Sequence, residues 1–305
     1  MTGIAIGPVR LLTSADPADD LDALLPSKNS LRRGSPTSKR AVIAAHDVLR
    51  TAGEDRDRIG VYVAQQHGAV GECAEFIASS YRGAPRLVSP AAFTESVENI
   101  VATHVSLTLG LTGIIETFTG TRAAAMQAIM AASDDLLCRE IDAALVVALG
   151  MGDKATKDAY GALYGKRAGT VTYLAGAAAF VMRRATSSPR LVYAGACCFG
   201  PGRDDRIAAV RSLWQAYRAQ SAGLAPPAAS VLSHEHAQAI CDIRIAIGAD
   251  AVCGAGGDSF ALDPIVQLFA SPERRAVICL SEEGTAGLLA IDDALTRAVT
   301  PPPPR

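Results

Sequence analysis

Arg122 stands in a stretch of sequence that is typical of a site for a nucleophile. Residues 113–129 read as an apolar strand, a tight turn of small residues and a helix that begins directly at Arg122. In such a strand-turn-helix elbow, the free backbone N–H groups of the helix start lower the pKa of a thiol placed there. A guanidinium is repelled by the same field, keeps its proton and has no lone pair for attack on a carbonyl. The pattern therefore predicts a scaffold for acyl chemistry whose nucleophile is missing.

A second group of reactive residue types lies in the last third of the chain. His234 and His236, with Cys241 and Asp242 nearby, do not have the spacing of a common zinc site. The glycine-rich residues 254–257 follow a strand, but they lack the full spacing and the downstream acid of a nucleotide-binding loop. We therefore expect neither a metal nor a cofactor.

An enzymatic alternative uses other nucleophiles. Cys253 or Ser259, with His234 as the base, would suit acyl transfer or thioester hydrolysis, provided that the base lies within hydrogen-bond reach. A further alternative is a homodimer that holds an acyl chain without any chemistry. The sequence alone leaves both open.

Composition excludes several classes of function. The 29 Lys and Arg residues and the 31 Asp and Glu residues nearly balance, so there is no electrostatic footprint for nucleic acid or for a membrane. The longest apolar stretch, residues 173–182, is far shorter than the roughly 20 residues of a spanning helix. No secretory leader is evident, and the seven cysteines form no Cys-x-x-Cys pair. We expect a cytoplasmic protein with reduced thiols, and the adjacent Cys197 and Cys198 to lie in the core.

Strands and helices alternate along the whole chain, which is the pattern of a mainly parallel sheet covered by helices. In the first half, we predict helices at residues 38–52, 71–80, 95–109 and 123–138 and strands at residues 59–64, 114–118, 143–149 and 170–182. In the second half, we predict strands at residues 191–198, 230–233, 251–253, 276–280 and 286–291 and helices at residues 204–220, 236–247 and 259–270. The repetition predicts an α/β protein of two duplicated halves, residues 1–186 and 187–296, in an α/β/α/β/α body, followed by a disordered proline-rich tail at 297–305.

These segments, in this order, resemble the β-ketoacyl-acyl carrier protein synthases of the thiolase fold. The resemblance rests on the strand at residues 58–63, the proline-to-asparagine segment at 89–99 and the leucine-glycine motif at 109–113. These motifs stand in register, and the resemblance covers nearly the whole chain. It implies the thiolase fold.

The resemblance also assigns the family's catalytic positions to residues of this chain. Arg122 stands where the family has its acyl-accepting cysteine, and His234 matches the first catalytic histidine, with Asp242 as the aspartate that follows it. Cys253 replaces the family's lysine and Asp258 its second histidine. Decarboxylative condensation needs a thiolate and two imidazoles, and a carboxylate at position 258 would repel the enolate that forms. The resemblance therefore implies a protein that does not condense.

Chain-length factors of type II polyketide systems resemble ketosynthases that have lost this cysteine. They form a heterodimer with an active ketosynthase and shape its acyl tunnel. The resemblance thus implies two partners, an active ketosynthase and an acyl carrier protein. This chain departs from those factors by having arginine where glutamine is common and by being shorter, as in polyene-forming systems, so both aromatic and polyene products remain open.

Three further expectations concern individual side chains. If Arg122 is buried, it needs a carboxylate, for which Asp258 is the first candidate and Glu282 and Glu283 are alternatives; if the register is wrong, it is a surface arginine at a helix start. The resemblance places Phe76 and Ile77 near the partner's acyl tunnel and adds Phe118 as a tunnel or interface residue. Simple core contacts are the alternative for Phe76 and Ile77.

Overall fold

The computed structural model describes residues 3–14, 21–25, 31, 34–50, 55–82, 88–150, 154–165, 175–185, 190–221, 229–232, 236–247, 252–253, 265, 276–280 and 284–291. The helices are α1 (Leu21–Leu24), α2 (Pro36–Leu49), α3 (Val70–Arg82), α4 (Pro90–Glu95), α5 (Ile100–Leu109), α6 (Ala124–Cys138), α7 (Lys154–Tyr164), α8 (Arg203–Gln220) and α9 (His236–Ile247). The strands are β1 (Gly3–Ile6), β2 (Arg10–Thr13), β3 (Ile59–Gln65), β4 (Ile115–Phe118), β5 (Ala143–Gly150), β6 (Gly176–Ala185), β7 (Arg190–Cys198), β8 (Ala229–Leu232), β9 (Val252–Cys253), β10 (Ala276–Leu280) and β11 (Thr285–Ile291).

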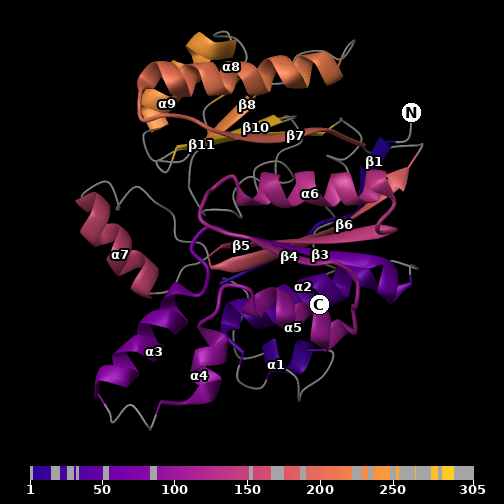
Figure 1. Ribbon diagram of the computed structural model, residues 1–305, viewed down its shortest axis with the longest axis vertical. Helices are drawn as coiled ribbons and strands as arrows, with labels where there is room; N and C mark the ends of the chain where they lie inside the picture. The colour runs from indigo at the N-terminus through magenta and orange to yellow at the C-terminus, as the bar shows by residue number, and fades with distance from the viewer. Residues whose placement is uncertain are drawn as a thin grey trace.

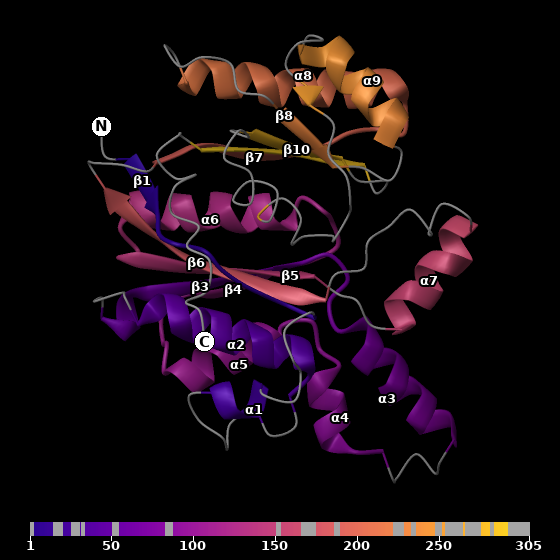
Figure 2. The same cartoon turned by 180° about the vertical axis from the view of Figure 1, so that it is seen from behind.

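The helices and strands stack in five layers (Figures 1 and 2). α2 and α5 cover the outer face of the sheet that contains β3, β4, β5 and β6, and α6 covers the inner face. The sheet with β7, β10 and β11 lies on the other side of α6, and α8 and α9 cover it from outside. This arrangement confirms the predicted α/β/α/β/α order of layers.

The two sheets are joined through β1. In the first half, β3 is parallel to β4 and β5, and β6 is antiparallel to β5. β1 pairs with β6 on one side and with β7 on the other, so the described strands form one path in the order β4-β3-β5-β6-β1-β7-β11-β10-β8-β9. β4 begins this path and pairs with β3 alone among the described strands. One edge of β4 therefore carries no described neighbour.

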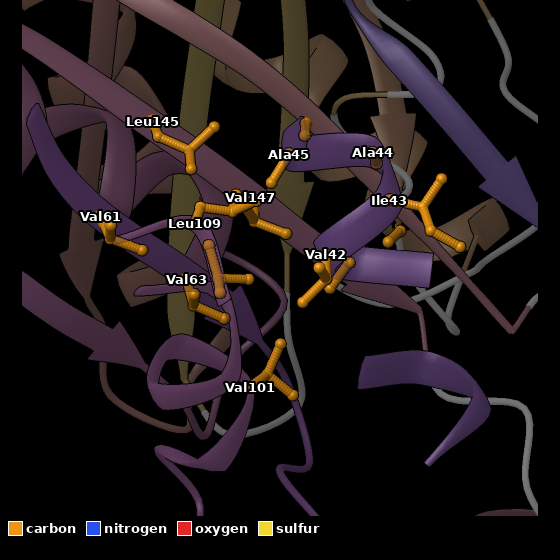
Figure 3. Close-up of a cluster of buried hydrophobic side chains, with 14 of the residues drawn as sticks. Val42, Ile43, Ala44, Ala45, Val61, Val63, Val101, Leu109, Leu145 and Val147 are labelled. Carbon is orange, nitrogen blue, oxygen red and sulfur yellow. The ribbon is translucent and has the colours of Figure 1, made fainter. Parts of the chain in front are cut away.

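The core forms because the central strands are apolar along their whole length. Every residue of β3 and β5 is buried, as expected for parallel strands covered on both faces. Figure 3 shows one side of this core, where Val42 and its neighbours on α2 lie near Val61 on β3 and Val147 on β5. On the other side, α6 is rich in alanine, whose small side chains let a helix lie close to a sheet on each face. These contacts fix α6 between the two sheets.

The predicted helix at residues 95–109 starts too early, because α4 ends at Glu95 and α5 begins only at Ile100. The Ser89 hydroxyl caps α4 by accepting a hydrogen bond from the Ala92 amide, and Pro90 begins the helix. α4 then closes when the Ser96 amide donates to the Phe93 carbonyl at 3.0 Å. Helix α4 was not predicted, and neither were the cap at Ser89 that begins it and the turn at Ser96 that separates it from α5.

Other expectations need smaller corrections. Strands β1 and β2 and helix α7 were not predicted, and β6 extends to Ala185 rather than ending at Met182. β1 pairs with a strand about 180 residues away in sequence, which local pattern cannot show. Cys198 is exposed and Cys197 half-buried, so the expectation that both lie in the core is wrong. The tail at 297–305 and nearly all of the predicted helix at 259–270 lie outside the described residues.

Three helices project from one side of the five layers. α3 contacts both α4 and α7, and the three lie together beside the sheets in Figures 1 and 2. We call α3, α4 and α7 the arm. Ile77, Tyr81 and Phe93 of the arm are large apolar side chains that are exposed. Within the described part of the chain, no helix has the length and apolarity needed to cross a membrane.

Candidate functional site

The chain turns sharply between β4 and α6. β4 ends at Phe118, Gly120 has a φ of 90°, and α6 begins at Ala124. A positive φ of this size is readily adopted only by glycine. The Gly120 amide donates to the Gln66 carbonyl at 2.9 Å, which ties the turn to the end of β3. The structure therefore contains the strand-turn-helix elbow that the sequence predicts.

The helix of the elbow begins two residues later than predicted. Arg122 lies in a turn in which the Ala124 amide donates to the Thr121 carbonyl at 3.2 Å, and Ala123 is the N-cap of α6. Successive alanines are equally good helix formers, so the sequence pattern does not mark the first helical residue. Arg122 consequently stands just before the positive end of the helix rather than within its first turn.

Arg122 is the largest fully buried side chain among the described residues, with a relative exposure of 0%. The interpretation as a surface arginine is therefore wrong. The second sheet closes over this region, because a Cβ atom at Gly287 of β11 would lie 2.3 Å from the Met126 sulfur and 3.1 Å from the Ala123 Cβ. The start of α6 is thus packed directly against β11.

A buried guanidinium at the elbow has a clear chemical consequence. It offers no lone pair and no exchangeable low-pKa proton, so residue 122 cannot carry an acyl group. Because its surface is inaccessible, it also occupies the space that a thiol and its acyl thioester would need. The elbow retains its shape and lacks the means for nucleophilic attack.

Two of the cysteines with described side chains, Cys197 and Cys279, are poor substitutes for the missing nucleophile. All six are free thiols, and Cys279 is buried on β10. Burial raises the pKa of the Cys197 thiol, and the neighbouring Cys198 raises it further. A raised pKa lowers the thiolate fraction, which is the opposite of activation.

The remaining predicted site residues cannot be placed. His234, Asp258, Ser259, Glu282 and Glu283 lie outside the described residues, as does the side chain of Cys253. β8 and β10 are parallel neighbours, and β11 begins beside the end of β7. The described strands that lead to or from these residues therefore have their ends on the same side of the sheet. A hydrogen bond of 2.7 Å from the Phe199 amide to the Gly284 carbonyl holds the end of β7 to the start of β11 on this side. Pairing of Arg122 with a carboxylate there stays a prediction.

Asp242, matched to the aspartate after the family's first histidine, holds two helices together. It lies on α9 with a relative exposure of 0%. Its two carboxylate oxygens accept hydrogen bonds from Arg203 Nε at 2.7 Å and from Arg206 Nε at 2.8 Å, both on α8. The hydrogen bond to Asp242 and its negative charge raise the pKa of Arg203. This carboxylate therefore ties α8 to α9 on the outer layer.

The three predicted tunnel or interface residues lie on two separate elements. The Phe76 ring on α3 packs against Phe93 of α4 at a centroid distance of 5.5 Å, and Ile77 is 48% exposed. Phe118 is at the end of β4 and lines a hollow of about 580 Å³ with residues of α6 and with Ala196 of β7. The Phe76 contact is made within the arm, on a helix that has no buried residue, and Ile77 faces outward. Neither residue is in the core, and their place at a tunnel or interface stays a prediction.

A polar network behind the elbow was not predicted. The Tyr160 hydroxyl on α7 accepts a hydrogen bond from Gln66 Nε2 at 3.1 Å and pairs with His67 Nε2 at 2.8 Å. On the other side, the Thr119 hydroxyl donates to the Glu98 carboxylate at 3.0 Å. The only sequence signal was the abrupt change from apolar to polar residues at the end of β3. The network joins the arm to the elbow.

Comparison with solved structures supports the fold. The chain is similar to the ishigamide ketosynthase/chain length factor, with a TM-score of 0.71 and 14% identity over 95% of this chain and 99% of that chain. A ketosynthase (ApeO) in complex with its chain length factor (ApeC) from Xenorhabdus doucetiae gives a TM-score of 0.70 and 12% identity over 95% and 98%. A type II PKS acyl-carrier protein in complex with its ketosynthase bound to the hexaketide (AntDE:AntF) gives 0.69 and 13% over 96% and 99%.

These likenesses show the thiolase fold of ketosynthases. No curated protein sequence matches the chain. The family described as "Beta-ketoacyl synthase, N-terminal domain" matches residues 9–170, which include β3, the elbow with Arg122 and α7. With more than half of its length in that match, the chain belongs to the β-ketoacyl synthase family.

Proposed function

We propose that this chain is a non-catalytic partner of a ketosynthase, of the chain-length-factor kind, in type II polyketide or fatty-acid-like biosynthesis. The observation that carries the proposal is the fully buried Arg122 at the elbow, where the family has its acyl-accepting cysteine. The partner makes the carbon-carbon bond and receives substrates from an acyl carrier protein. This chain contributes part of the wall of the acyl tunnel.

The free edge of β4 supports the need for a partner. The Val61 amide donates to the Ile114 carbonyl at 2.7 Å, and this bond shows which backbone groups of β4 face β3 in the parallel ladder. The N–H and C=O groups of Glu116 point toward β3, whereas those of Ile115 and Thr117 point away from it. Ile115 is also 47% exposed. An apolar edge with outward backbone groups is a template for pairing with another strand.

The hollow beside Phe118 supports a role next to an acyl chain. It lies between β4 and α6 at the same side of the molecule, and Met130 and Ala131 contribute apolar surface to it. A subunit docked along β4 would cover this hollow. Phe118 would then face the space between the two subunits, while Ile77 would extend from the arm.

Co-expression tests the proposal. A tagged form of this chain, expressed with the ketosynthase and the acyl carrier protein encoded beside it, should co-purify with the ketosynthase in a 1:1 complex. Polyketide product should appear with both subunits and disappear when this chain is omitted. The purified chain alone should neither decarboxylate malonyl groups nor form an acyl-enzyme. Full product formation by the ketosynthase without this chain would contradict the proposal.

The same protein tests the enzymatic alternative. If the chain uses Cys253 or Ser259 with His234, an acyl thioester should label it, and Cys253→Ala or Ser259→Ala should remove the label. Stoichiometric labelling that one of these two substitutions removes would replace the proposed function with acyl transfer or thioester hydrolysis. Native mass spectrometry of the chain alone separates both from a homodimeric acyl-binding protein.

A further inference from the structure

The free edge of β4 continues onto one side of α6 to form a single surface. Gln127, Met130, Ala131 and Asp134 of α6 recur at helical spacing, and all four line the hollow with residues 117–119 of the β4 end. Leu137, three residues beyond Asp134, is 53% exposed. We call β4 and this side of α6 the edge face. It combines apolar side chains with the outward backbone groups of Ile115 and Thr117.

The charge of the edge face has one sign. Glu116 lies on β4, Asp134 and Asp135 lie on α6, and neither element contains lysine or arginine. Burial raises the pKa of Glu116, and the negative charge of Asp135 raises it further, so these two carboxyl groups are close enough to interact. Asp135 also accepts a hydrogen bond from the Tyr62 hydroxyl on β3.

The cations near the end of α6 are engaged elsewhere. Arg58 Nε lies 3.1 Å from the Asp142 carboxylate, and Arg184 Nη2 lies 2.9 Å from the same group. Both arginines also donate to backbone carbonyls around the end of α6. These side chains hold the connection from α6 to β5, so they do not neutralise Glu116 and Asp134.

A second copy of this chain fits the edge face poorly. Consider two copies of β4 paired antiparallel across a two-fold axis perpendicular to the sheet. Residues that lie opposite each other then point to the same face of the sheet. Glu116 can therefore lie opposite only the even-numbered residues of the other β4, which share its face. When β4 pairs with its own copy at its centre, Glu116 lies opposite Glu116 of that copy in one register and opposite Phe118 in the next. Two carboxylates face each other in the first register, and a carboxylate faces an apolar ring in the second. Directly opposite side chains have Cβ atoms about 5 Å apart, and like charges there are destabilising. Asp135, which is close enough to Glu116 to interact with it, adds negative charge on each copy.

We propose that the edge face selects a partner whose matching strand and helix carry lysine or arginine, and that it excludes a second copy of this chain. This inference rests on the proposed function, because it states the chemistry of the ketosynthase surface that docks there. Apolar Ile115, Met130 and Leu137 supply the area of the interface. The carboxylates of Glu116 and Asp134 decide which subunit is accepted, since an unpaired carboxylate in an interface is costly.

The test uses the ketosynthase that co-purifies with this chain. The double variant Glu116→Gln/Asp134→Asn removes both charges at nearly constant volume, and Glu140→Gln, an exposed acid beyond the end of α6, is the matched control. At about 50 mM salt, the double variant should bind the ketosynthase about tenfold more weakly, with a smaller salt dependence, and the control should bind like the wild type. Circular dichroism and thermal unfolding confirm that each variant is folded.

Sedimentation of the chain without its partner provides a second measurement. The wild-type chain should remain monomeric at about 10 μM, a concentration at which a stable dimer would assemble. A wild-type homodimer, or an unchanged ketosynthase affinity of the double variant, overturns the inference while leaving the proposed function intact. If no ketosynthase co-purifies at all, the proposed function and this inference both fail.

Discussion

At the scale of single residues, two buried charged side chains define what the elbow and the outer helices of the second half can do. Arg122 is fully buried at the elbow, and Asp242 is fully buried between α8 and α9. Burying a charge is unfavourable unless other groups compensate it, so each of these residues constrains its surroundings. The first abolishes a nucleophile, and the second organises the outer helices.

We expect Asp242→Asn to destabilise the protein by about 2 kcal/mol. Removing one partner of a buried ion pair leaves the opposite charge uncompensated, and the partial exposure of Arg203 and Arg206 reduces the usual effect. Urea unfolding followed by circular dichroism measures the change. Asp134→Asn, an exposed acid on α6, should change the free energy of unfolding by less than about 0.5 kcal/mol. Equal stability of the two variants would show that Asp242 does not tie α8 to α9.

The ion pairs of Asp142 predict a dependence of stability on pH. Hydrogen bonds from Arg58 and then Arg184 hold the pKa of the Asp142 carboxyl below its ordinary value. A carboxyl group whose pKa is lower in the folded state stabilises the protein above its unfolded pKa of about 3.9, and this contribution is lost as the pH falls through the folded value. Asp142→Asn should therefore be less stable than the wild type at pH 7, and the difference should shrink toward pH 2.5.

Urea titrations at a series of pH values give this comparison. Asp158→Asn, which removes an exposed carboxylate beside Lys154 on α7, serves as the control and should leave the pH profile nearly unchanged. A wild type and an Asp142→Asn variant that lose stability in parallel on acidification would show that another carboxyl group sets the acid limit.

At the scale of elements, α6 is the structure on which the site depends. It lies between the two sheets, and its first turn is packed against β11 at Gly287. The elbow is also held from behind, because the Gln66 carbonyl accepts from the Gly120 amide and the Gln66 side chain bonds Tyr160 of the arm. The elbow is therefore held in place both by β11 in the second sheet and by Tyr160 of the arm.

We expect Gly287→Ala to destabilise the fold by about 1–3 kcal/mol, since the added methyl group would overlap Met126 and press on Ala123 in a packed interior. In a double-mutant cycle, Met126→Ala should reduce this penalty, because it removes the nearer of the two contacts. Gly161→Ala on α7, where no atom lies within 4 Å of the new Cβ, should be neutral or stabilising. Additive effects of Gly287→Ala and Met126→Ala would show that β11 does not press on α6.

At the scale of the whole molecule, the chain is a five-layered body in which β4 stands at one end of the described strand path. The strand path runs from β4 to β9, and β4 carries the exposed Ile115 beside the elbow. Because β4 precedes the elbow directly, a partner that docks on this edge also reaches the hollow beside Phe118. Under the proposed function, assembly and the shape of the acyl tunnel would therefore be linked through one short strand.

Thr117→Pro should prevent assembly while preserving the fold of the isolated chain. Proline removes the Thr117 N–H group, which the ladder directs away from β3, and an edge strand tolerates that loss. Glu116→Pro is the contrasting variant, because it removes an N–H group directed toward β3 and should lower the melting temperature. Native mass spectrometry with the co-expressed ketosynthase and thermal unfolding measure the two effects. A 1:1 complex that survives Thr117→Pro would show that the partner docks elsewhere.

The sequence by itself determined the features that depend on neighbouring residues. Continuous apolar runs identified β3, β5 and β10, and small residues around Gly120 identified the elbow, because backbone geometry and burial of whole strands leave a local pattern. The absence of a thiol at position 122 is likewise a fact of sequence. The exact helix starts and the break between α4 and α5 were not predicted, since the ends of helices are set by caps and turns that side-chain periodicity does not locate.

The tertiary structure alone decided the features that depend on distant partners. It buried Arg122, brought Gly287 against Met126, tied Asp242 to α8 and joined the two sheets through β1. A side chain at position 122 has the same local sequence whether it is exposed or covered. The adjacent start of α6, at Ala123 and Met126, is packed by a strand about 160 residues away in the sequence. Packing between layers is a property of the assembled sheets, and no single segment of the chain encodes it.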